Sequence, residues 1–104
     1  MTASTDDVLA PLRLRIDAID AAIVELLAKR MDCVGEVIGI KQAHGLPARI
    51  ESRVEEVVAN VRAGAEGVGA PPDLAETVYR SMIAWVIAHE ERHLPPPVRL
   101  REGE

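Results

Sequence analysis

The chain has 104 residues and a formal net charge of -5, and 48% of its residues are hydrophobic but only 2% are aromatic. This length is enough for one small domain, whose core must be aliphatic. The negative charge argues against nucleic acid as a partner. The single cysteine, Cys33, excludes an internal disulfide and a zinc framework. No signal peptide or apolar run of about 18 residues is evident, so we expect a cytoplasmic protein without a membrane partner.

Residues from about Leu9 to His44 are predicted to form one long amphipathic helix. Steps of three and four along it pick out a single side, made of Arg13, Ile16, Asp20, Ile23, Leu27, Arg30, Val34, Val37 and Lys41. A packed seam should be apolar, but three cations and one acid interrupt this one. Because an unpaired buried cation is costly, we expect an anionic ligand among them.

The spacing of the three cations indicates a dimer. On a straight helix Arg30 and Lys41 are roughly 16 Å apart along the axis, and Arg13 and Lys41 roughly 42 Å. Arg30 and Lys41 can therefore reach one small anion between them, but Arg13 of the same helix cannot. If all three bind one ligand, Arg13 must come from a second copy of the chain.

A second helix is predicted to begin between Ala48 and Ser52, after a stop at Gly45 and Pro47, and to end near Ala63. Ser52 and Glu55 have the spacing of a capping box. Its apolar stripe consists of Val54, Val57, Val58 and Val61. A loop is expected at Gly64, Gly67, Gly69, Pro71 and Pro72.

A third helix is predicted from Pro72 or Asp73 to about His93, and the residues from Pro95 to Glu104 are expected to be extended or disordered. No strand pattern competes, so the fold class is all-α, with a long, a short and a medium helix in one domain over residues 1–94. A first helix of about 35 residues spans roughly 50 Å, which is too long for two shorter helices to bury. Pairing with a second chain is the simplest remedy.

Each candidate residue also has an alternative interpretation. Arg30 fits a surface arginine with a packed stem, and Lys41 complements the dipole at a helix end. Arg49 and Arg53 fit surface cations paired with neighbouring acids. Glu90 is different, because it continues the row of Tyr79, Ile83 and Val86 on the third helix, which we expect to be buried.

A buried Glu90 would favour its neutral form, which can donate a hydrogen bond. The alternative is that the helix end has already reached solvent at this residue. His89 and His93 have the spacing found in zinc-binding helices but lack a third ligand, so no metal site is predicted.

In order and spacing, these segments resemble the all-helical chorismate mutases, a family that includes the isochorismate-pyruvate lyases. The resemblance covers about Leu9 to Leu94 and rests on Leu12 to Asp20, Leu26 to Met31, Ile40-Lys41, Pro47, Arg53 and Ile83 to Ala88. It implies an intertwined helical homodimer with two shared active sites. It also implies an isomerase without cofactor or covalent intermediate, in the shikimate pathway and in the biosynthesis of aromatic amino acids or antibiotics.

The resemblance also implies roles for individual residues. Arg13 from the partner chain and Arg30 would bind the substrate carboxylates. Lys41 would contact a carboxylate and the ether oxygen, and Glu90 would hydrogen-bond the same ether oxygen. The substrate-binding residues would be Arg13, Arg30, Lys41, Ile50, Arg53, Val54, Val86 and Glu90, of which Arg30, Lys41 and Glu90 are catalytic.

The chain departs from the family at two places. Family members usually carry an acid at the positions of Ile50 and Val54, where the ring C4 hydroxyl is bound. The absence of these acids favours a substrate with a different ring substitution, such as 4-amino-4-deoxychorismate or isochorismate. Glu90 stands where Gln is common and must be protonated to donate. Activity is therefore expected to fall as the pH rises through the titration of Glu90, and Glu90→Gln to flatten this profile.

We therefore predict a homodimeric mutase that converts chorismate or its 4-amino-4-deoxy analogue to prephenate or 4-amino-4-deoxyprephenate. The first alternative is an isochorismate-pyruvate lyase, which the segment Arg53-Val54 also resembles, but the turn before it is one residue longer than expected for a lyase. The second is a non-catalytic helical dimer, which need not retain Arg13, Arg30, Lys41 and a hydrogen-bonding residue at position 90 together. The resemblance also leaves room for an activating partner enzyme.

Overall fold

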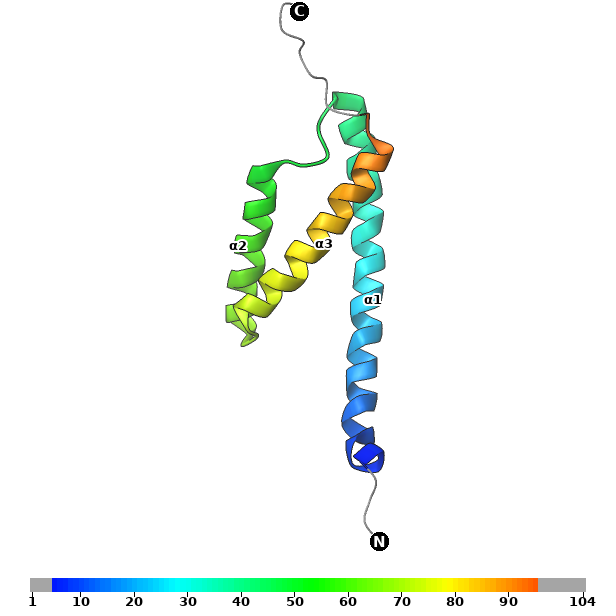
Figure 1. Ribbon diagram of the computed structural model, residues 1–104, viewed down its shortest axis with the longest axis vertical. Helices are drawn as coiled ribbons and strands as arrows, with labels where there is room; N and C mark the ends of the chain where they lie inside the picture. The colour runs from blue at the N-terminus through cyan, green and yellow to red at the C-terminus, as the bar shows by residue number, and fades with distance from the viewer. Residues whose placement is uncertain (1–4, 96–104) are drawn as a thin grey trace, which may run out of the picture. The chain divides into compact units, whose positions relative to one another are not determined.

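The computed structural model describes the backbone of residues 5–95 and the side chains of residues 8–95. It contains three helices, α1 (Thr5–His44), α2 (Glu51–Val68) and α3 (Pro72–His93), in the order shown in Figure 1. Residues 5–95 contain no strand. The all-α prediction is therefore confirmed, as is the order of a long, a short and a medium helix.

Helix α1 begins at Thr5, earlier than the predicted start near Leu9, and Pro11 lies inside it. A proline lacks the backbone N–H, so one hydrogen bond is missing in this turn while the helix continues on both sides. The predicted end is confirmed. Gly45 adopts a φ of 64°, and the amide of Leu46 donates to the carbonyl of Lys41 at 2.9 Å, which closes the last turn.

The chain divides into two parts, and the boundary lies within α1 after Gly35. In the first part, no side chain between Val8 and Cys33 is buried. The large apolar residues exposed there are Val8, Leu12, Leu14, Ile16, Ile19, Ile23, Val24, Leu26 and Leu27. Among the described residues, this stretch of α1 therefore forms no core of its own.

The second part, from Glu36 onward, contains the hydrophobic core. Helices α2 and α3 form a hairpin with a short turn between them (Figure 1). Its α2–α3 core consists of Val54, Val58, Ile83 and Ile87. Ala48, Val57 and Tyr79 pack against this core from its edge. Three of the four valines predicted to form the stripe of the second helix, Val54, Val57 and Val58, thus pack in the core with the third helix.

Two details of α2 differ from the prediction. The helix extends to Val68, so Gly64 and Gly67 lie inside it and only Gly69, with a φ of 76°, ends it. Each helical glycine costs only about 1 kcal/mol relative to alanine, which tertiary packing can offset. The capping box is also wrong, because α2 begins at Glu51 and its N-cap, Ile50, makes no side-chain cap hydrogen bond.

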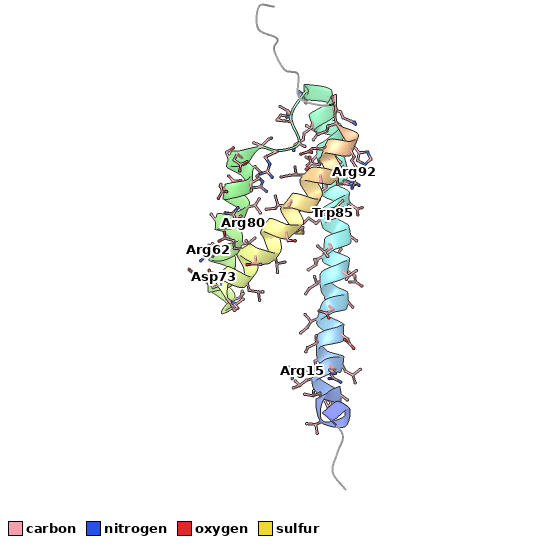
Figure 2. All side chains as sticks on the ribbon, viewed as in Figure 1. Arg15, Arg62, Asp73, Arg80, Trp85 and Arg92 are labelled. Atoms are coloured by element: carbon pink, nitrogen blue, oxygen red, sulfur yellow. The ribbon has the colours of Figure 1, made fainter. Side chains whose placement is uncertain are left out.

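An ion-pair network joins α2 to α3. Arg62 contacts Asp73 at 2.9 Å and Glu76 at 2.8 Å. Arg80 contacts Glu76 at 2.7 Å and Glu55 at 3.3 Å. Figure 2 labels three of these residues, Arg62 on α2 and Asp73 and Arg80 on α3. The hydrogen bond from Arg80 is the main cause of the lowered pKa of Glu76, and Arg62 adds to it.

The lowered pKa of Glu76 predicts that this network weakens in acid. Its contribution to stability is complete above the ordinary value of 4.5 and is lost as the pH falls through the lower pKa of the folded state. Between about pH 6 and about pH 3, the melting temperature of the wild type should fall more than that of Glu76→Gln. Circular dichroism melts of both proteins test this, and equal falls would contradict it.

Candidate active site

Lys41 and Glu90 form a buried ion pair between the end of α1 and the end of α3. The Lys41 Nζ atom donates to Oε1 of Glu90 at 2.9 Å and to the carbonyl oxygen of Ala48 at 2.8 Å. The two charged side chains are only 11% and 7% exposed. The helix end has therefore not reached solvent at Glu90, in contrast to the alternative considered above.

The local fold explains why Lys41 is held in this place. Gly45 stops α1 four residues after Lys41, and the chain turns back so that Ala48 approaches the lysine. The side chain of Ala48 packs against the α2–α3 core, which fixes its carbonyl group. An ammonium group has three N–H donors. Glu90 and Ala48 use two of them, so one donor remains for a ligand.

A buried charge is stable only when it is paired and hydrogen-bonded. The Lys41–Glu90 pair meets this condition, and no buried side-chain nitrogen or oxygen of the described residues lacks a partner. An anionic group that approaches Lys41 can accept from the third donor, but it shares the charge of the ammonium with Glu90.

The other predicted residues of the second part lie at different depths. Val54 and Val86 are buried, and Val54 belongs to the α2–α3 core. Ile50 is 36% exposed at the N-cap of α2. Arg53 is exposed and pairs with Glu56, as the surface interpretation expects. Whether these residues contact a substrate stays a prediction.

The two remaining cations belong to the first part of the chain. Arg13 is exposed on α1, and Arg30 is half-buried further along the same helix. Both precede Gly35, whereas Lys41 and Glu90 follow it. Their assignment to substrate carboxylates stays a prediction, as does the donation of Arg13 across a dimer interface.

The histidines of α3 take part in ring contacts. Trp85, labelled in Figure 2, stacks on His89 with 5.3 Å between ring centroids, and His89 and His93 are 4.8 Å apart. Within the described part of the chain, no group of three histidine, cysteine or acidic residues has a metal-binding arrangement. None of the described helices is long and apolar enough to cross a membrane.

Two contacts near the Lys41–Glu90 pair were not predicted from the sequence. One is the carbonyl of Ala48, and the other is a hydrogen bond of 2.8 Å from Nε2 of Gln42 to the carbonyl oxygen of His93. The last carbonyls of a helix always need partners from outside it. That rule predicts that a donor is present at the end of α3, but not which residue supplies it.

The described residues thus form an all-α fold in which the Lys41–Glu90 pair joins α1 to α3. Residues 12–91 match the family model described as chorismate mutase type II. The chain therefore belongs to the chorismate mutase type II family, whose members are isomerases.

Curated relatives support this assignment. The chain is 43% identical over 75 residues to a T-protein of Enterobacter agglomerans, and 34% identical over 86 residues to a T-protein of Haemophilus influenzae. The matches cover 72% and 83% of this chain but only 20% and 23% of those proteins. A 4-amino-4-deoxychorismate mutase of Streptomyces pristinaespiralis is 32% identical over 81 residues, which are 78% of this chain and 63% of that protein.

Proposed function

We propose that the chain is a pericyclic mutase that rearranges chorismate or its 4-amino-4-deoxy analogue without a cofactor. The observation that carries the proposal is the buried Lys41–Glu90 pair, with one lysine donor left for a ligand, in a member of the chorismate mutase type II family. In the reaction the ether C–O bond breaks while a C–C bond forms within the same molecule. No oxidant, reductant or second substrate is needed.

Charge explains how these residues accelerate the reaction. Negative charge develops on the ether oxygen as the C–O bond breaks, and the ammonium of Lys41 stabilises it. A neutral Glu90 donates a second hydrogen bond to the same oxygen. Arg30 and a partner's Arg13 bind the two carboxylates and hold the side chain of the substrate over its ring.

The proposal includes a homodimer with shared sites. The first part of α1 exposes its apolar residues along its length, and none of its side chains between Val8 and Cys33 is buried. Such a helix is stable only when an apolar partner covers it, and a second copy of α1 has the matching length. A second copy also supplies the Arg13 that the same helix cannot bring to Lys41.

We favour the amino analogue as the substrate. Ile50 and Val54 place aliphatic side chains at the positions where an acid usually binds the ring C4 hydroxyl, and Val54 is buried among other aliphatic residues. The relative that is named 4-amino-4-deoxychorismate mutase adds support. Synthesis of an amino-substituted precursor, as for an antibiotic, would be the biological context.

A direct turnover assay tests the proposal. Chorismate, 4-amino-4-deoxychorismate and isochorismate are offered separately to purified protein, and the product is identified by mass spectrometry and ultraviolet absorbance. We expect rearrangement of the amino analogue, or of chorismate, and a loss of about tenfold to a hundredfold in Arg30→Ala. Formation of salicylate and pyruvate from isochorismate would indicate a lyase instead. Absence of turnover with all three substrates would contradict the proposal that the chain is an enzyme of this kind.

A mixing experiment provides the control for the shared site. Arg13→Ala and Arg30→Ala are each expected to be impaired. In a dimer of one Arg13→Ala chain and one Arg30→Ala chain, one of the two sites receives both native arginines. Random pairing of equal amounts makes about half of the dimers mixed, so the mixture should regain about a quarter of the wild-type activity. If mixing restores nothing, Arg13 and Arg30 do not act in one site formed by two chains.

A further inference from the structure

The last turn of α3 is capped by a side chain from α1. His93 is the last residue of the helix, so no backbone N–H of the helix donates to its carbonyl. Helices often solve this problem with a glycine in the left-handed conformation. Here Leu94 follows with an extended backbone, φ -112° and ψ 148°, and Nε2 of Gln42 donates to the carbonyl of His93 at 2.8 Å.

In both α1 and α3, the residues of this cap are close in sequence to the Lys41–Glu90 pair. Gln42 directly follows Lys41 in α1, and His93 is three residues, less than one helical turn, after Glu90 in α3. The same two helix ends are thus joined by two parallel hydrogen bonds, at 2.9 Å and 2.8 Å. The close backbone packing among the described helices is between α2 and α3. Side chains therefore link the end of α1 to the end of α3.

We propose that Gln42 is a positioning residue, which fixes the last turn of α3 and so holds the Glu90 carboxyl in register with Lys41. The inference rests on the proposed function, because Glu90 and Lys41 act on the ether oxygen there. Gln42 itself touches no substrate. Its side-chain amide donates to the carbonyl of His93, and it affects the reaction only by positioning Glu90.

The geometry defines what should change when the cap is lost. A frayed last turn lets Glu90 move away from Lys41, which weakens an interaction made in the transition state more than one made with the bound substrate. The fall should therefore appear in kcat rather than in KM. A merely structural role would lower the melting temperature without this selective effect.

Two variants remove the donor in different ways. Gln42→Met keeps the length of the side chain without polar atoms, and Gln42→Glu keeps the shape but presents oxygen to the carbonyl. Both should lower kcat by roughly threefold to tenfold, since one hydrogen bond is lost, with little change in KM. Hydrogen exchange of the amides of residues 91–93 should become faster in both.

Arg80→Met is the matched control, because it removes another exposed link between helices, from Arg80 on α3 to Glu55 on α2. It should lower the melting temperature and leave kcat and the exchange of residues 91–93 unchanged. Unchanged kcat in Gln42→Met, or a loss in only one of the two Gln42 variants, would overturn the positioning role while the mutase function stands. A wild type inactive on all three substrates would overturn both.

Discussion

Replacing Lys41 by methionine is expected to lower kcat/KM by about a thousandfold, because the ether oxygen loses a charged donor in a site with little water. The same change should destabilise the fold by about 3 kcal/mol, since it leaves the Glu90 carboxylate buried without its cation. The structure supports both expectations, because the two side chains are 11% and 7% exposed and 2.9 Å apart. Steady-state kinetics and urea unfolding measure the two losses.

A double variant separates the catalytic loss from the structural one. In Lys41→Met with Glu90→Gln, no charge is buried, so most of the stability should return while the activity stays low. Arg49→Met is the control for loss of a cation, because Arg49 pairs with Glu51 in an exposed position and should matter little. Recovery of activity together with stability would show that Lys41 only supports the fold.

The boundaries of the helices were predictable where the sequence contains strong stop signals. Gly45 and Pro47 end α1, and Pro72 begins α3, because proline and a left-handed glycine leave the backbone few choices. Gly64 and Gly67 misled the prediction for α2. An isolated glycine is only a weak helix breaker, and buried Ala65 keeps this end of the helix packed.

The candidate site was predictable as a set of residues but not as a set of contacts. Helical periodicity placed Lys41 and Glu90 on inward-facing rows, and the structure buries both side chains. The sequence did not indicate that they bind each other, because they are 49 residues apart and on different helices. The contacts of Gln42 with His93 and of Lys41 with the carbonyl of Ala48 were not predictable either. A local sequence pattern does not indicate which group from another part of the chain will lie nearby in the fold.

The pH profile of the enzyme is the second result with a large expected effect. Ionised Glu90 accepts a hydrogen bond from Lys41, as in the structure, and thereby neutralises the cation that the ether oxygen needs. It also cannot donate to that oxygen. The active form must then carry a neutral Glu90, so kcat/KM should be lower at high pH than at low pH.

Glu90→Gln should remove this fall, because an amide donates a hydrogen bond at every pH and leaves the charge of Lys41 free for the substrate. At high pH the variant should be more active than the wild type, and at low pH the two should be similar. Glu91→Gln, at the neighbouring exposed carboxyl, should keep the wild-type profile. If Glu90→Gln shows the same fall as the wild type, Glu90 does not donate to the ether oxygen.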